Sequence, residues 1–115
     1  MVAREYVPDA GDLVWIDFTP QAGREQAGRR PAVVLSPRSY NERAGLAVMC
    51  PITSQSKGYP FEIALPTGGR VRGVILSDHI KSLDWRERKA EKAGRLASSI
   101  LSEVLERVSS LLQLQ

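Results

Sequence analysis

The chain has 115 residues, of which 43% are hydrophobic and 25% charged, and its net charge is +3. This composition excludes an intrinsically disordered chain, and the length predicts one domain spanning residues 1–115. The single cysteine, Cys50, excludes an internal disulfide and fits a reducing compartment. No apolar run approaches the roughly 18 residues of a membrane span, and the first residues form no apolar signal segment. We therefore expect a cytoplasmic protein that makes no membrane contact.

The first half of the chain predicts three strands and one long loop. Three runs are rich in β-branched, aromatic and other apolar residues, as strands are: residues 12–18, 32–36 and 46–52. The loop between the first two runs ends at Pro31 and contains Gly23 and Gly28. Long loops in compact domains are often functional. One helical turn is expected at 39–43.

The second half predicts shorter strands and a terminal helix. Two runs of strand composition and two weaker ones follow in order: residues 61–65, 71–76, 80–85 and 91–96. Apolar residues then recur at helical spacing from Ile100 to Leu112, with Ser98 or Ser99 as the expected N-cap. The pattern predicts a mainly β protein with helices (α+β), folded as a small β-barrel that an amphipathic C-terminal helix covers.

The residue types exclude several kinds of catalytic site. One histidine, His79, excludes a two-histidine acid–base pair within one chain, and a lone histidine is more often a packed or surface residue. Metal ligands would have to be scattered carboxylates, and Cys50 lies in an apolar run typical of a core. The chain also lacks a glycine-rich phosphate loop and a G-x-S-x-G motif. We therefore expect neither a metal ion nor a cofactor.

The stretch GREQAGRRP, residues 23–31, suggests a phosphate site. Pro31 holds Arg30 extended at the start of the second strand, and Thr53 follows the third strand. If these strands are neighbours, the two residues converge, and a guanidinium fork beside a hydroxyl suits phosphate oxygens. Glu25 would then be a candidate base. In the alternative, Arg30 pairs with a carboxylate such as Asp17, and Thr53 only begins a turn.

The positive charge is concentrated in residues 70–95, which hold eight basic and four acidic residues. A locally basic surface favours a polyanion as partner. A solvated face with mixed charges is an equal alternative on charge alone.

The sequence resembles the MazF/PemK family of bacterial toxin endoribonucleases. Four blocks carry the resemblance: PDAGDLVWIDFTP (8–20), GREQAGRRPAVVLSP (23–37), PITSQSKGYPFEI (51–63) and GVILSDHIKSLDWR (73–86). The resemblance implies a barrel related to SH3 and CcdB folds, a homodimer, and metal-independent and ribosome-independent cleavage of single-stranded RNA at a short sequence. Attack by the ribose 2′-OH would give a 2′,3′-cyclic phosphate and a 5′-OH. The implied inhibitor is an acidic MazE-like antitoxin.

The resemblance also implies roles for single residues. Arg30 and Thr53 match the family's essential Arg and Thr, and Glu25 matches its acidic loop residue. Residues expected along the RNA path are Phe18, Gln26, Gln55, Lys57 and Lys81. Arg29 stands where a relative has His, and its permanent charge adds it to the RNA-binding set.

Aromatic residues are candidates for stacking on the RNA bases. Phe18 and Tyr59 fit this role, whereas Trp15 is interpreted as a core or interface residue.

Two alternatives remain beside the endoribonuclease. One is a CcdB-like toxin that poisons DNA gyrase, although the chain ends Leu-Gln-Leu-Gln rather than Trp-Gly-Ile. The other is an RNA-binding barrel without turnover.

Overall fold

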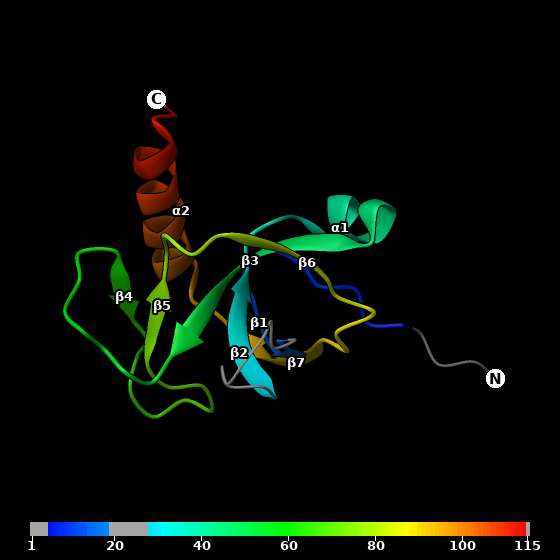
Figure 1. Ribbon diagram of the computed structural model, residues 1–115, viewed down its shortest axis with the longest axis horizontal. Helices are drawn as coiled ribbons and strands as arrows, with labels where there is room; N and C mark the ends of the chain where they lie inside the picture. Colours follow the sequence, from blue (N-terminus) through cyan, green and yellow to red (C-terminus); the bar gives the residue numbers. More distant parts are fainter. Residues whose placement is uncertain (1–4, 19–27, 115) are drawn as a thin grey trace, which may run out of the picture.

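A computed structural model describes residues 5–18 and 28–114, and its centre is an antiparallel sheet (Figure 1). The strands are β1 (Asp12–Asp17), β2 (Arg29–Val34), β3 (Leu46–Thr53), β4 (Glu62–Ala64), β5 (Val74–Leu76), β6 (Lys81–Asp84) and β7 (Glu91–Arg95). Two helices complete the fold: α1 (Arg38–Ala44) and α2 (Ser98–Leu112). Every predicted strand is found, and the expected helical turn at 39–43 is extended to two turns as α1.

Strand order places β3 at the branch point of the sheet. Neighbours along the sheet follow the order β4-β5-β3-β2-β1-β7, and β6 also pairs with β3. The two ends of the long strand β3 therefore serve different partners: Leu46–Met49 pair with β6, and Ile52 and Thr53 pair with β5. In the described residues the sheet is not closed, so the fold class is confirmed as mainly β with two helices, but the barrel is not.

Both faces of the central strands are buried, because successive side chains of a strand point to opposite faces. Leu13, Val33 and Cys50 belong to one cluster, whose members also include Ile52, Ile75 and Val104 of α2. Val14, Ile16, Ala32, Val34 and Met49 belong to the second cluster, on the other face, with Leu83 and Trp85. The alternation along β1, β2 and β3 therefore assigns each residue near the candidate site to one of two faces.

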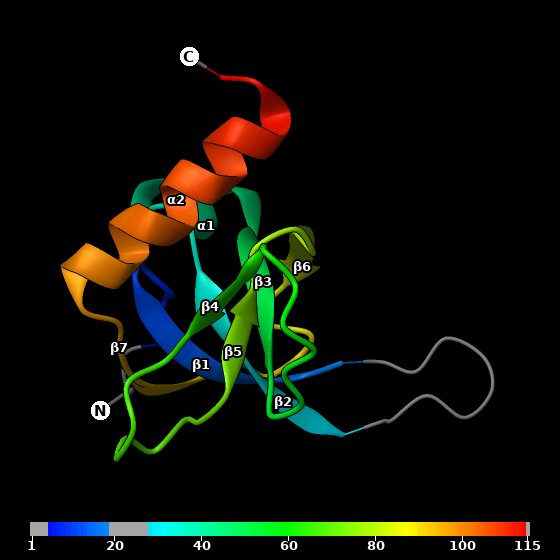
Figure 2. The ribbon, with the colours of Figure 1, turned by 90° about the vertical axis from the view of Figure 1, so that its left-hand side faces the viewer.

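Helix α2 covers the first cluster through Val104, which is fully buried, and lies beside β4 in both views (Figures 1 and 2). Its start differs from the prediction. The N-cap position is Ala97, and neither Ser98 nor Ser99 caps the helix, because Ser98 is already the first helical residue. The Leu96 N–H donates to the Gly11 carbonyl at 2.8 Å, which holds the chain extended as far as Ala97.

Strands β2 and β5 also differ from their predicted bounds. β2 begins three residues early, at Arg29, because its first residues pair with β1 down to Asp17 opposite Arg29. β5 begins at Val74 rather than Val71, because its partners β3 and β4 pair with it only from Val74 onward. The connection between β4 and β5 is therefore longer than expected.

Candidate active site

Arg30 and Thr53 lie at the same end of two neighbouring strands, as expected from their positions in the sequence. In the antiparallel pair β2–β3, Ala32 lies opposite Pro51. Arg30 and Thr53 are each two residues beyond this pair, toward the same end. Residues two apart in a strand share a face, and so do residues directly opposite in a pair. Arg30 and Thr53 therefore belong to one face at one end of the β2–β3 pair.

Two hollows flank this end of β3. One, here called the arginine hollow, has a volume of about 450 Å³ and is lined by Trp15, Arg29, Arg30, Pro31, Ile52, Ser54, Arg70 and Arg72. The other, here called the threonine hollow, has a volume of about 270 Å³ and is lined by Thr53, Gln55, Lys57, Tyr59, Glu62, Leu76, Asp78 and His79. Consecutive residues 52–54 alternate between the two hollows, so both hollows meet at the end of β3.

The backbone of Thr53 is fixed by a close approach of Gly73. Thr53 pairs with Val74 of β5, and Gly73 has a φ of +118°, in the region that favours glycine. A Cβ added at Gly73 would overlap the Thr53 carbonyl oxygen and lie 2.8 Å from its carbonyl carbon. The Thr53 hydroxyl accepts a hydrogen bond from the Gln55 N–H at 3.2 Å. Gly73 therefore sets where Thr53 lies.

Glu62 organises the loop that follows β3. Its carboxylate accepts the Ser56 hydroxyl at 2.7 Å, the Lys57 N–H at 2.9 Å and the Gly58 N–H at 3.1 Å. The N–H of Lys57 and the Ser56 hydroxyl are the main causes that lower the pKa of Glu62. Three donors on one carboxylate hold the segment that carries Gln55 and Lys57, the two residues predicted to contact RNA.

Arg29 uses its guanidinium within the protein. It forms ion pairs with Asp17 and Glu91, both at 2.9 Å, and donates to the carbonyls of Trp15 and Lys89. The carboxylate that the alternative interpretation gave to Arg30 is therefore paired with Arg29. Because neighbours in a strand point to opposite faces, Arg29 lies on the face away from Thr53.

The other predicted RNA contacts are spread around the same end of the sheet. Lys81 is exposed and lies opposite Met49 of β3, on the face that Thr53 shares. Phe18 is half-buried and packs against the second cluster, on that face as well. Gln55 and Lys57 line the threonine hollow. Glu25 and Gln26 lie outside the described residues.

The remaining reactive groups fit the sequence interpretation. Cys50 is buried in the first cluster, and burial raises the pKa of its thiol to about 12. His79 is exposed, with Nε2 3.8 Å from the Asp78 carboxylate.

Residues 5–18 and 28–114 contain no group of three His, Cys, Asp or Glu residues placed to hold a metal ion. In the same residues no helix is long and apolar enough to cross a membrane.

The sequence predictions did not name four residues that lie at the site. Arg70 and Arg72 line the arginine hollow, and the basic segment that contains them was the only signal. Gly73 and Glu62 act on the backbone around Thr53 and Lys57. The contact of Gly73 joins residues twenty positions apart, and that of Glu62 depends on the fold of the loop after β3, so no sequence motif predicted either.

Comparison with known proteins places the chain among bacterial toxins. Residues 9–112 match the family model described as PemK-like, MazF-like toxin of type II toxin-antitoxin system. The endoribonuclease toxin MazF of Escherichia coli strain K12 is 51% identical over 112 residues, which cover 97% of this chain and 99% of that protein. The endoribonuclease PemK of Escherichia coli is 30% identical over 97% of this chain and 87% of that protein.

Comparison with solved structures leads to the same family as comparison with related sequences. A MazE-MazF crystal structure from Deinococcus radiodurans is similar at a TM-score of 0.91 and 56% identity, over 96% of this chain and 100% of that chain. A crystal structure of MazF from the same organism gives a TM-score of 0.88 with the same identity and coverage. The family resemblance of the four sequence blocks is therefore confirmed.

Proposed function

Since the chain belongs to the family of PemK-like, MazF-like toxins of type II toxin–antitoxin systems, we propose that it cuts single-stranded RNA at a short sequence, without a ribosome or a metal ion. The endoribonuclease class is itself confirmed by the family match and by the identity of 51% over nearly the whole chain. The proposal concerns the substrate, the chemistry and the residues. It treats residues 1–115 as one toxin domain that acts on messenger RNA and so inhibits growth.

The proposed reaction is transesterification at phosphorus. The ribose 2′-OH attacks the adjacent phosphate and loses its proton to a base, while the bond to the 5′-oxygen of the next nucleotide breaks. The products are a 2′,3′-cyclic phosphate and a 5′-OH end, and the leaving oxygen takes up a proton. No water or metal is consumed in this step. The enzyme has to stabilise the charge that builds on the phosphate oxygens and to provide for both protons.

Arg30 and Thr53 are assigned to the charged phosphate oxygens. The observation that supports this assignment is the register of β2 and β3, which brings both residues to one face at one end. A guanidinium stays protonated in proteins, so Arg30 acts as a donor and not as the base. The Thr53 hydroxyl is a second donor on a backbone that Gly73 fixes. Preorganised donors of this kind each contribute roughly 2.7–4 kcal/mol to catalysis.

Proton acceptance from the 2′-OH is assigned to Glu25, on the strength of the family resemblance. The strongest rival among the described residues is His79, because it lines the threonine hollow and imidazole suits proton transfer near neutral pH. Glu62 is a poor base, since three donors hold its carboxylate and lower its pKa. Comparing Glu25→Gln with His79→Gln in single-turnover cleavage separates the two: the larger loss identifies the base.

The proposed partners follow from the relatives. MazE-MazF structures from Deinococcus radiodurans support an acidic MazE-like antitoxin for this chain, which belongs to the same family. We expect the toxin to act as a homodimer in the cytoplasm, where messenger RNA is available. Phe18, Gln55, Lys57 and Lys81 remain the proposed RNA contacts, with Gln26 and Arg29. Tyr59 is 61% exposed and lines the threonine hollow, which supports base stacking there.

The test is incubation of the purified protein with a long RNA in the presence of EDTA, followed by mapping of the ends. The proposal predicts new 5′-OH ends at one short recurring sequence, and no product from the same RNA with a 2′-deoxy nucleotide at each mapped cut. Retarded but intact RNA would favour a passive binding barrel. Inhibition of gyrase without RNA cuts would favour a CcdB-like toxin.

A further inference from the structure

We propose that Arg70 and Arg72, on the connection between β4 and β5, bind the backbone phosphate next to the one that is cut. This inference rests on the proposed RNA-cutting function and extends its site by two residues. Arg70 and Arg72 line the arginine hollow together with Arg30, which is assigned to the scissile phosphate. The next anion along a bound RNA strand is the neighbouring phosphate of the same strand.

The charge around the arginine hollow is unbalanced. Four of its lining residues are arginines, and none is a carboxylate. Arg29 is matched by Asp17 and Glu91. Within residues 5–18 and 28–114, Arg70 and Arg72 form neither an ion pair nor a hydrogen bond. Two guanidinium forks beside a hollow that carries no acidic side chain are suited to an external anion, and phosphate oxygens fit the fork geometry.

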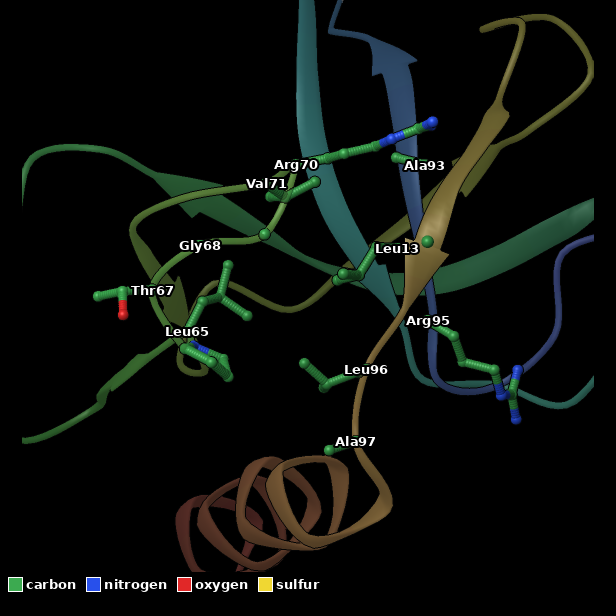
Figure 3. A pocket seen from close by; sticks show the side chains of 13 residues that line it. Leu13, Leu65, Thr67, Gly68, Arg70, Val71, Ala93, Arg95, Leu96 and Ala97 are labelled. Atoms are coloured by element: carbon green, nitrogen blue, oxygen red, sulfur yellow. The ribbon is translucent and has the colours of Figure 1, made fainter.

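The fold presents the two arginines in a fixed way. Val71, which separates them, is 5% exposed and belongs to the first cluster, whereas Arg70 and Arg72 on either side are exposed. The Leu65 N–H donates to the Gly73 carbonyl at 2.9 Å and closes the connection at its base. In Figure 3 the long Arg70 side chain extends away from Leu65 and Leu96, the residues with which Val71 lines the apolar hollow.

An RNA strand accounts for the position of this cluster better than an acidic protein does. The arginine hollow adjoins the threonine hollow across the end of β3, so the arginines continue the path that already contains Arg30 and Thr53. Because Arg30 itself lines the arginine hollow, a phosphate bound at Arg30 lies beside the hollow that Arg70 and Arg72 also line. Binding of an acidic antitoxin segment at Arg70 and Arg72 is a separate outcome of the test.

The first measurement is the salt dependence of RNA binding by Arg70→Gln/Arg72→Gln. The probe is a short RNA that contains the mapped cut site with a 2′-deoxy nucleotide there, so that it is bound but not cut. Each phosphate contact on a single strand contributes about 0.7 to the slope of log K against log salt. Because both arginines contact one phosphate, the double variant should lower the slope by about 0.7 and weaken binding roughly tenfold or more at low salt.

The matched control is Arg38→Gln/Arg43→Gln on α1. It also removes two positive charges, but far from the β4–β5 connection (Figure 1). It should change the slope by less than about 0.3, since these residues are outside both hollows at the end of β3. Equal slopes for the two double variants would overturn the proposal, because the effect would then be one of net charge.

The second measurement removes the phosphate charge instead of the arginines. A series of probes carries one uncharged methylphosphonate at successive linkages around the cut site. At the linkage that Arg70 and Arg72 contact, the replacement should weaken binding to wild type but have no further effect on the double variant. Additive losses at every linkage would overturn the proposal.

The outcomes separate this inference from the proposed function. If wild type neither cuts nor binds the RNA, the proposed function fails and the inference fails with it. If wild type cuts the RNA while the double variant keeps the wild-type slope, only the inference fails. Loss of binding to an acidic antitoxin peptide, with RNA binding unchanged, would assign the two arginines to that partner instead and so overturn the proposal.

Discussion

Two hollows of similar size use their charged residues in opposite ways. One is the arginine hollow. The other, here called the N-terminal hollow, has a volume of about 440 Å³ and is lined by Glu5, Tyr6, Val7, Asp9, Asp12, Arg38, Lys92 and Arg95. It holds three acidic and three basic residues, whereas the arginine hollow holds four basic residues and none that is acidic. The lining residues of the N-terminal hollow balance in formal charge, whereas Arg70 and Arg72 of the arginine hollow form no ion pair within the described residues.

The contacts of Asp12 show how the acidic and basic residues of the N-terminal hollow interact. Asp12 is 2% exposed, and its carboxylate accepts the Tyr6 hydroxyl at 2.5 Å, the Asp9 N–H at 3.1 Å and Arg95 Nη1 at 2.7 Å. Burial and the Asp12 carboxylate raise the pKa of Tyr6 far above its usual range. A buried charge with several partners joins the N-terminal segment to β1 and β7. Charge in the N-terminal hollow therefore serves stability, whereas the charges of Arg70 and Arg72 in the arginine hollow are available for a ligand.

The largest effect is expected from Gly73→Ala, which acts on Thr53, at the end of β3 that the arginine hollow flanks. The added Cβ has to displace the Thr53 carbonyl, so the Thr53 donor moves and cleavage should fall by roughly 10²-fold or more. The strained backbone should also cost about 1–3 kcal/mol of unfolding free energy. Single-turnover cleavage and denaturant unfolding measure the two losses.

Gly68→Ala is the control, because Gly68 lies in the same connection with a φ of +92° but open space around its Cβ. It should lose stability to a similar or smaller extent and keep the wild-type rate. Equal loss of cleavage in both variants would mean that backbone strain, and not the position of Thr53, explains the effect.

A smaller effect, confined to the other hollow, is expected from Asp12→Asn. Replacing the charged acceptor weakens hydrogen bonds from Tyr6 and Arg95, each to a charged group, and should destabilise the fold by roughly 1.5–3 kcal/mol. The salt slope of RNA binding should not change, since Asp12 is outside the arginine hollow. Denaturant unfolding measures the loss of stability. The control is Glu106→Gln, on the exposed side of α2.

The sequence predicted the parts of this comparison that depend on local pattern. Strand composition located every strand, and Pro31 and the end of the third strand located Arg30 and Thr53 at neighbouring strand ends. The helix start was wrong because a tertiary hydrogen bond of Leu96, not a serine side chain, decides where α2 begins.

The rest depends on contacts between distant segments. Arg29 and Arg30 are adjacent and alike in the sequence, and only the pairing of β2 with β1 shows that Arg29 meets Asp17 and Glu91. Arg70 and Arg72 join Arg30 because Val71 is buried and β5 pairs with β3, which no spacing within residues 70–95 shows. Glu25 and Gln26 stay predictions.

The smallest effect is expected from protonation of the Glu62 carboxylate as the pH is lowered. A carboxylate with a lowered pKa contributes order above its ordinary pKa of 4.5, and the order is lost as the pH falls through the lower value of the folded state. Protection of the Lys57 and Gly58 amides, the hydrogen-exchange rate relative to the intrinsic rate at each pH, should therefore persist somewhat below pH 4.5 and be lost at lower pH. Glu62→Gln should show fast exchange throughout, and a pH profile unchanged by this substitution would contradict the role of Glu62.

The most direct test of the account is single-turnover cleavage of one mapped RNA by Arg30→Ala and Thr53→Ala, with circular dichroism to verify that each variant is folded. Both residues are assigned to the phosphate whose charge increases during the reaction. The account predicts that each substitution slows cleavage by roughly 10²–10³-fold at saturating RNA. Wild-type rates in both folded variants would contradict it.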